Sequence, residues 1–160
     1  MDEHTPLPPS ATRRSSRGKA SPKSPVYVLD DQIGFILRQA YQKHALLFVE
    51  CFGEDFTPTQ WAAVAKLSEI GGCSQNLLGR LTAMDAATIK GVVDRLMKRG
   101  YIESTPSATD RRRVLITLTA AGKKAYERGV GAALRVSSDT LLRLKPRDRT
   151  VLLRLLKQLG

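Results

Sequence analysis

The feature that most constrains the fold is a change in the spacing of apolar residues at Gly100. Before it, DAATIKGVVDRLMKRG (85–100) places apolar residues three and four positions apart, as an amphipathic helix does. After it, apolar and polar residues alternate in 101–104 and again in 114–118. This alternation predicts two short strands joined by an extended hairpin loop over 105–113. We therefore expect a helix followed directly by a β-hairpin.

The first predicted helix covers residues 30–52. Asp30 and Asp31 are expected to cap it, because carboxylates accept from free backbone N–H groups and favour the positive end of a helix. Gly53 is expected to end it. Its apolar stripe is predicted to consist of Ile33, Ile36, Leu37, Ala40, His44, Leu47 and Cys51.

Three more helices are predicted between this one and the hairpin. Thr57 and Gln60 form a capping box with Pro58 at the first helical position, and the helix they open ends at Gly71-Gly72. Ser74 caps a short helix over 74–83, and Asp85 caps the next one after a tight turn. The predicted inward-facing residues of these helices are Trp61, Val64, Ala65, Leu67, Leu77, Leu78, Leu81, Ile89, Val92, Val93 and Leu96. Two short helices joined by a tight turn predict a helix-turn-helix.

Two helices are predicted after the hairpin. The first starts with the cap Thr119 and runs to about Leu144, where Lys145-Pro146 breaks it, and the second covers 146–159. The apolar stripe of the second consists of Val151, Leu152, Leu155, Leu156 and Leu159. The predicted fold is mainly α with a small β-hairpin, a winged helix-turn-helix in the order α-α-α-α-β-β-α-α.

The terminal helices carry more apolar surface than the central unit can cover. We expect residues 26–56 and 119–160 to form a helical dimerisation region and residues 57–118 to form the DNA-binding unit, with a homodimer covering the terminal helices. The alternative is that these helices fold back within one chain. Residues 1–25 are rich in Pro, Ser, Arg and Lys, which predicts a disordered basic tail.

Charge and composition limit the partners. The 160 residues carry a formal net charge of +11 with 42% hydrophobic content, which favours a polyanionic partner over a merely solvated basic surface. No apolar run approaches the ~18–20 residues of a membrane span, and the N-terminus lacks the apolar segment of a secretory signal. We therefore expect a cytoplasmic protein that does not bind membranes.

The helix over 85–100 is the predicted DNA reader. It has the length to lie in the major groove, where its first residues reach the bases. Ala and Thr methyl groups suit thymine methyls, Lys suits guanine, and the start of the preceding helix suits phosphate. The predicted contacts on these two helices are Ser74, Gln75, Ala86, Ala87, Thr88, Lys90, Gly91 and Arg95. Lys66, Arg80 and Arg99 are expected to be solvated charges.

The hairpin loop carries Asp110 followed by Arg111, Arg112 and Arg113. A hairpin beside a helix-turn-helix is a wing, and arginine suits the negative potential of a narrow minor groove. We expect Arg112 to enter that groove, steadied by Asp110, with Arg111 and Arg113 beside phosphates. The alternative is that Asp110 only relieves repulsion among the arginines.

At these two motifs the chain is similar to a known family. DRRRVLITLTAAGKKAYE resembles the wing and following helix of the MarR (multiple antibiotic resistance regulator) family, whose pattern is Asp-x-Arg, a short strand, Leu-Thr and Gly. TIKGVVDRLMKRGYI resembles the family's recognition helix. The resemblance covers about 30–159 and implies a homodimeric regulator, usually a repressor, on a pseudo-palindromic double-stranded DNA operator. It also implies that Asp110 and Arg112 form the wing pair and that Thr88–Arg95 line the major groove.

The resemblance further implies a small aromatic acid effector near the junction of the two regions. The chain resembles the branch that represses nicotinate-degradation genes and responds to a hydroxylated nicotinate. An aromatic carboxylate needs an apolar slot with a cation or a donor. The candidates are Arg38, Tyr41 and His44 in the first helix and Trp61 in the second. His44 and Trp61 lie at apolar positions, where core packing is the alternative role.

Three other functions are alternatives to DNA-dependent regulation by an effector. The sequence has no Gly-rich phosphate loop, metal-ligand cluster or nucleophile motif, so we expect no catalysis, metal or cofactor. A winged helix that binds proteins is possible on this scaffold but would not need three adjacent arginines. A thiol redox regulator would use Cys51 or Cys73, which otherwise serve as small buried apolar residues.

Overall fold

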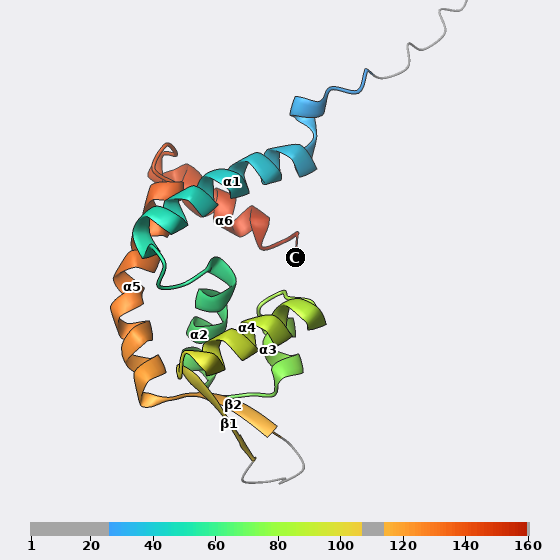
Figure 1. The fold of residues 1–160 in the computed structure, drawn as a ribbon. Helices are drawn as coiled ribbons and strands as arrows, with labels where there is room; N and C mark the ends of the chain where they lie inside the picture. Colours follow the sequence, from blue (N-terminus) through green and yellow to red (C-terminus); the bar gives the residue numbers. More distant parts are fainter. Residues whose placement is uncertain (1–25, 107–113, 160) are drawn as a thin grey trace, which may run out of the picture.

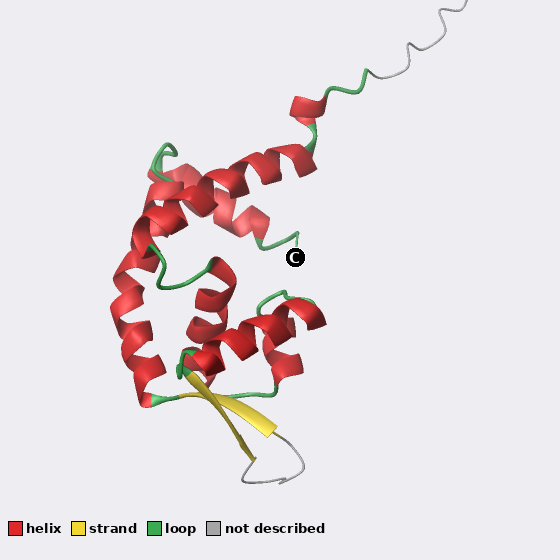
Figure 2. Cartoon of the chain, in the orientation of Figure 1, coloured by secondary structure: helices red, strands yellow, loops and turns green. Residues whose placement is uncertain are grey.

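The computed structural model describes residues 26–106 and 114–159, which fold into helices around one antiparallel hairpin (Figure 1). The elements are the short 3₁₀ turn η1 (Leu29–Asp31), α1 (Ile33–Phe52), α2 (Pro58–Ile70), α3 (Gln75–Leu81), α4 (Ala86–Lys98), β1 (Ile102–Pro106), β2 (Val114–Leu118), α5 (Ala120–Thr140) and α6 (Pro146–Leu156). Their order confirms the predicted fold class. The helices α1 and α6 lie at one end, α5 runs down one side, and the hairpin projects at the other end (Figure 2). The predicted tail over 1–25 lies outside the described residues, as does the part of the predicted hairpin loop over 107–113. The first two residues of that predicted loop, Thr105 and Pro106, belong to β1.

Short polar side chains start the central helices where the sequence predicts. Thr57 Oγ1 accepts from the backbone N–H of Gln60 at 3.3 Å, and Gln60 Oε1 accepts in return from the backbone N–H of Thr57 at 3.2 Å. Ser74 and Asp85 cap α3 and α4 in the same way. Each cap satisfies a backbone donor that has no partner inside its helix.

The start of α1 differs from the prediction. Asp30 and Asp31 do not cap this helix, because both lie in η1 and the extended residue Gln32 separates them from it. The backbone N–H of Gln32 closes the turn by donating to the carbonyl of Leu29 at 3.0 Å. The local turn therefore takes up the residues that were expected to begin the helix.

The last two helices are shorter than predicted. Helix α5 ends at Thr140 and α6 ends at Leu156. Arg149 satisfies carbonyls of the intervening turn, with Nε donating to Leu144 at 2.9 Å and Nη2 to Leu142 at 3.3 Å. Because a side chain supplies these hydrogen bonds, the chain can leave the helix before Pro146.

The hairpin is joined closely to α4 and to the segment before α3. Gly100 has φ 69°, a left-handed conformation that lets the N–H of Tyr101 donate to the carbonyl of Leu96 at 3.0 Å. Tyr101 thus belongs to the helix end, and β1 begins at Ile102, one residue later than predicted. On the other strand, Ile116 exchanges backbone hydrogen bonds with Cys73, a pairing that the sequence did not predict.

The central unit has a closed apolar core. Its fully buried side chains come from α2, α3 and α4 and include Val64, Leu67, Leu78, Ile89, Val92 and Leu96. The prediction that Leu81 faces inward is wrong, since this residue is 44% exposed. Helix α3 ends at Leu81, so no further turn of the helix covers it.

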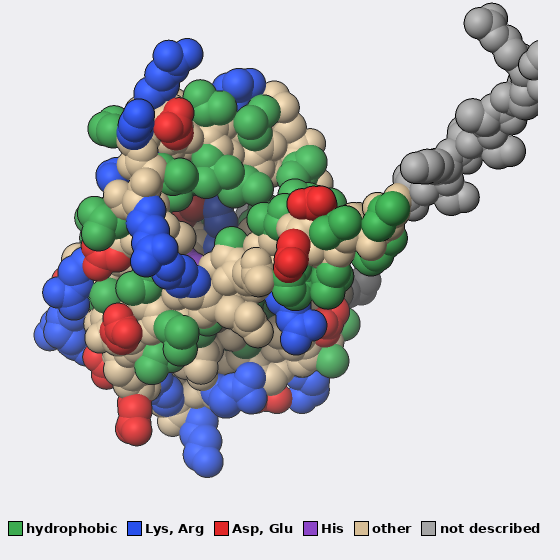
Figure 3. Space-filling model, turned by 90° about the horizontal axis from the view of Figure 1, so that it is seen from above, with side chains coloured by type: hydrophobic (Ala, Val, Ile, Leu, Met, Phe, Trp, Pro, Cys, Tyr) green, Lys and Arg blue, Asp and Glu red, His purple; other side chains and the backbone are tan. Residues whose placement is uncertain are grey.

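The terminal helices leave apolar side chains uncovered in the single chain. In α1 the residues that are buried are Phe48 and Phe52, which lie outside the predicted stripe, whereas Ile33 is 63% exposed. Helix α1 packs against α5, and both of its buried residues lie in its last two turns. Figure 3, which views this end of the molecule, shows hydrophobic side chains gathered there among lysines and arginines. Within the described residues, no helix is both long and apolar enough to cross a membrane.

Candidate functional site

Helix α4 has one buried face and one exposed face. Ile89, Val92, Val93 and Leu96 are at most 3% exposed and anchor the helix in the core, as predicted. The residues expected to contact DNA lie on the remaining surface: Ala86, Ala87, Lys90 and Arg95 are exposed, and Thr88 and Gly91 are half-buried. The apolar face therefore anchors the helix in the core, while its polar face is exposed to solvent.

Thr88 is held by the N-cap of the same helix. Asp85 Oδ1 accepts from the backbone N–H of Thr88 at 2.7 Å, and Oδ2 accepts from its hydroxyl at 2.9 Å. These hydrogen bonds, the backbone one first, lower the pKa of the Asp85 carboxyl. The Thr88 hydroxyl is therefore occupied as a donor, which leaves its oxygen lone pairs and its methyl group for DNA.

Lys90 forms an ion pair with Asp94 that was not among the expected contacts. Its Nζ lies 2.9 Å from Oδ2 of Asp94 one turn later, and both side chains are exposed. The signal was present in the sequence, because a Lys and an Asp four residues apart on a helix face one another. Donation from Lys90 to a guanine would compete with Asp94 for the same ammonium group.

Arg95 lies across the helix surface at Gly91. A Cβ atom at Gly91 would be 3.4 Å from the nearer guanidinium nitrogen of Arg95. The missing side chain at Gly91 thus lets the guanidinium lie close to the backbone of α4. The charge of Arg95 therefore lies on the exposed surface of α4.

The start of α3 is brought next to the hairpin. Ser74 Oγ accepts from the backbone N–H of Leu77 at 3.3 Å, and Ser74 itself is exposed, with Gln75 half-buried. The adjacent residue Cys73 is the one that pairs with Ile116 of β2. The two predicted phosphate contacts therefore lie beside the base of the wing. The predicted wing residues Asp110, Arg111, Arg112 and Arg113 lie outside the described residues.

The four predicted effector residues fall into two groups. Arg38 and Tyr41 are exposed on α1, and His44 Nδ1 lies 2.9 Å from Oγ1 of Thr140, which ties α1 to the end of α5. Trp61 instead belongs to an aromatic cluster, with its ring centroid 5.0 Å from that of Phe52. This position fits the alternative given above, that Trp61 packs in the core.

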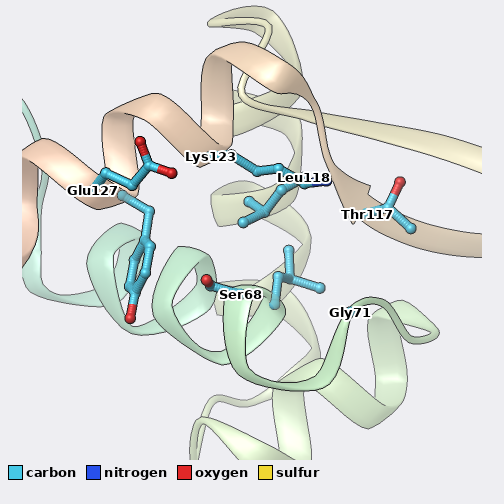
Figure 4. Close-up of a pocket in the computed structure, with 8 residues that line it drawn as sticks. Ser68, Gly71, Thr117, Leu118, Lys123 and Glu127 are labelled. Atoms are coloured by element: carbon cyan, nitrogen blue, oxygen red, sulfur yellow. The ribbon is translucent and has the colours of Figure 1, made fainter.

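A pocket of about 540 Å³ opens elsewhere, between the end of α2, the end of β2 and the first turns of α5 (Figure 4). Its lining residues are Leu67, Ser68, Gly71, Thr117, Leu118, Lys123, Tyr126 and Glu127. Figure 4 shows Lys123 extending from α5 toward Leu118 and Thr117. The pocket combines apolar walls with one cation, Lys123, one carboxylate, Glu127, and several hydroxyl groups. No motif in the sequence marked it, because it is assembled from three separated segments.

The two cysteines have different environments, and both are free thiols. Cys73 is 4% exposed, and burial raises the pKa of its thiol, partly offset by a backbone hydrogen bond from Leu78. A raised pKa lowers the fraction of reactive thiolate. Cys51 is half-buried, and its Sγ accepts from Nε of Arg135 at 3.4 Å.

An anchored helix with an open polar face, beside a two-stranded hairpin, defines a winged helix-turn-helix protein of the DNA-binding class. The MarR family profile matches residues 56–114. The transcriptional repressor NicR of Pseudomonas putida is 32% identical over 134 residues, which cover 83% of this chain and 85% of NicR. The chain therefore belongs to the MarR family.

Solved structures agree with this assignment. A probable transcriptional regulator from Pseudomonas aeruginosa is 52% identical with a TM-score of 0.80, covering 83% of this chain and 100% of that one. BpsR of Bordetella bronchiseptica, whose DNA binding is regulated by 6-hydroxynicotinic acid, is 32% identical with a TM-score of 0.81, covering 84% of this chain and 97% of BpsR. The family confirms the predicted DNA-binding transcriptional regulator and the prediction that the protein is not an enzyme.

Proposed function

We propose that the chain is a homodimeric cytoplasmic repressor that binds a pseudo-palindromic operator and leaves it when a small aromatic acid binds. The observation that carries the DNA-binding part is the two-faced helix α4, whose buried side holds Lys90 and Arg95 outward. Repression is the activity of NicR, to which the chain is similar over most of its length.

The uncovered apolar side chains of α1 and α6 support a dimer. A second copy would cover residues such as Ile33 of α1 and Leu155 of α6, which are 63% and 46% exposed. A two-fold dimer presents its two α4 helices to half-sites roughly one helical turn, ~10 bp, apart. The operator is therefore expected to contain two inverted half-sites at that spacing.

The pocket between α2, β2 and α5 is the effector site that we favour. Its volume of about 540 Å³ lies in the usual range for small-molecule sites. Lys123 supplies a cation for a carboxylate, and Ser68 and Tyr126 supply hydroxyls for a ring substituent such as that of a hydroxylated nicotinate. The pocket touches the end of β2, so a ligand there would contact both the wing and the scaffold.

The test is a mobility shift on the promoter DNA beside the protein's own gene, repeated with nicotinate, 6-hydroxynicotinate and benzoate. We expect a shifted band that one of the acids removes. Lys123→Gln should raise the acid concentration needed for release without changing DNA affinity, whereas Arg38→Gln should not. The reverse pattern would move the effector site to the α1 face with Tyr41 and His44, and no release by any acid would remove the effector proposal.

The wing is tested through Arg112. Arg112→Ala should weaken operator binding by about 1–3 kcal/mol and make the salt dependence shallower, because one phosphate-proximal charge is lost. Changes at Thr88 or Lys90 should alter which base sequence is preferred. A salt titration in which Arg112→Ala matches the wild type would contradict the wing assignment.

Thiol regulation remains a separate hypothesis, favoured only by the contact between Arg135 and Cys51. Cys51→Ser and Cys73→Ser variants would be tested for DNA release under peroxide. If both behave like the wild type, oxidation of these thiols plays no part in release.

A further inference from the structure

Arg99, expected from the sequence to be a solvated charge, makes specific contacts at the end of α4. Its Nη1 donates to the backbone carbonyl of Asp55, and its Nη2 donates to the hydroxyl of Tyr101 at 3.3 Å. The guanidinium carbon lies 4.7 Å from the ring centroid of Tyr101 and 5.5 Å from that of Phe56. Arg99 is exposed, as expected, but its charged group also bonds to protein atoms on two sides.

These partners join parts of the chain that are far apart in sequence. Asp55 and Phe56 lie in the segment that leaves α1, whereas Arg99 is the C-cap of α4 and Tyr101 leads into β1. One side chain thus connects the helix that faces DNA to the segment that leads back to the α1 end. Arginine at this position also suits the negative end of the α4 dipole.

The rings under Arg99 continue toward α1 and α5. Phe56 packs edge-on against Phe52 and Trp61 at centroid distances of 6.1 Å and 5.6 Å. Phe52 stacks on Phe48 at 4.3 Å, and Trp61 stacks on Tyr126 of α5 at 5.6 Å. Arg99 therefore closes a continuous set of aromatic contacts that runs from α1 and α5 to the end of α4.

We propose that Arg99 is a positioning residue for DNA binding. By tying the end of α4 to the segment after α1, it fixes how far the helix stands from the α1–α6 end of its own protomer. In the homodimer of the proposed function, on which this inference rests, that distance sets the separation of the two α4 helices. Arg99 thereby determines which half-site spacing the dimer accepts.

The chemistry of the contact explains why lysine would not substitute. A guanidinium is planar and presents donors in fixed directions, so it can stack on Tyr101 and donate to Asp55 and the tyrosine hydroxyl together. A lysine ammonium keeps the charge but lacks that planar, two-sided geometry. Arg99→Lys therefore keeps the positive charge but removes the planar contacts that we propose position α4.

The experiment uses the full-length protein and an operator duplex selected by wild-type binding from a random pool. Affinity is measured for this duplex and for versions with one base pair inserted or removed between the half-sites. For Arg99→Lys we expect the wild-type preference for the selected spacing to fall by about 3- to 10-fold, in keeping with the usual size of such couplings, with the salt slope unchanged. Tyr101→Phe, which removes one hydrogen bond and keeps the ring, should give a smaller change in the same direction.

Three outcomes would overturn the inference. An unchanged spacing preference means that the contact does not position α4. An equal loss of affinity at every spacing, with a lower unfolding temperature, means that Arg99 only stabilises the fold. A shallower salt slope in Arg99→Gln with the wild-type spacing preference means that Arg99 acts as a phosphate contact. A wild-type protein that selects no duplex contradicts the proposed function itself, which sets that failure apart from the other three.

Discussion

The central unit from α2 to β2 and the α1–α6 end of the molecule differ in how they bury apolar residues. In the central unit most large apolar side chains of α2 and α4 point into one core, where Leu67 and Leu96 are at most 1% exposed. At the other end, α6 has no buried residue in the single chain. The first region buries its apolar side chains within the chain, in a core that also includes Phe48 and Phe52 of α1. The second region leaves apolar side chains exposed in the single chain, and the proposed dimer would cover them.

This difference matches the two tasks that we propose for the protein, which are contact with DNA and association into a dimer. A closed core gives α4 a fixed shape, which reading a groove requires. Open apolar faces make the spacing of two such readers depend on association. Substitutions in the two regions should therefore have different signatures, one independent of protein concentration and one dependent on it.

The largest effect is expected in the closed core. Leu96→Ala should lower the free energy of unfolding by about 2–5 kcal/mol, because it removes buried methyl groups and leaves a cavity. Denaturant titration would measure the loss, which should not vary with protein concentration. Leu81→Ala, on the exposed end of α3, is the matched control and should cost far less. Equal losses at the two positions would mean that the central core is not closed as described.

The next effect tests the open end. Replacing Leu155 and Leu156 of α6 by alanine should weaken the dimer by about 1.5–3 kcal/mol for the two side chains together, because each is already more than half buried in the single chain. Analytical ultracentrifugation would show dissociation at concentrations where the wild type is a dimer. If the double variant dimerises like the wild type, α6 does not contribute to the interface and the comparison of the two ends fails.

Signals that act within a few residues made the central unit predictable. The caps Thr57, Ser74 and Asp85 and the buried positions of α4 all follow from spacing along one helix. The same logic misplaced the start of α1, because a carboxylate suits a short turn as well as a helix cap.

Contacts between distant segments could not be read from the sequence. Arg99 and Asp55 are 44 positions apart, and Cys73 pairs with Ile116 across two helices and a strand. The sequence does not indicate these partners, because residue type alone does not tell whether an exposed arginine is solvated or stacked on an aromatic ring. For the same reason the sequence suggested Arg38 and His44 for the effector and did not point to Lys123 of the pocket that we propose instead.

Two glycines of α5 allow a packed position and an open position to be compared on one helix. A Cβ at Gly129 would lie 2.4 Å from the ring of Trp61, whereas a Cβ at Gly131 would meet nothing within 4 Å in the single chain. Gly129→Ala should destabilise by about 1–3 kcal/mol through overpacking. Gly131→Ala should stabilise by up to about 1 kcal/mol, because alanine favours helix more than glycine does. Thermal unfolding of both variants gives the two signs, and a weaker dimer in Gly131→Ala would place that residue at the interface.

The smallest effect concerns pH and the cap of α4. The pKa of Asp85 is lowered in the folded protein by hydrogen bonds from Thr88, and in the unfolded chain it returns to about 3.9. A lowered folded pKa means that the stabilisation is complete above about pH 5 and is lost as the pH falls below 4, through the folded value.

The substitution Asp85→Asn tests this dependence, because asparagine caps a helix well and does not titrate in this range. We expect the stability of the wild type to fall more steeply than that of Asp85→Asn between about pH 5 and pH 2, since only the carboxylate loses its acceptor character on protonation. Denaturant titrations at a series of pH values would measure the difference, with Asp94→Asn as a matched variant at an exposed carboxylate of the same helix. Parallel curves for wild type and Asp85→Asn would show that the carboxylate charge does not strengthen this cap. The start of α4 would then depend on hydrogen-bond geometry alone.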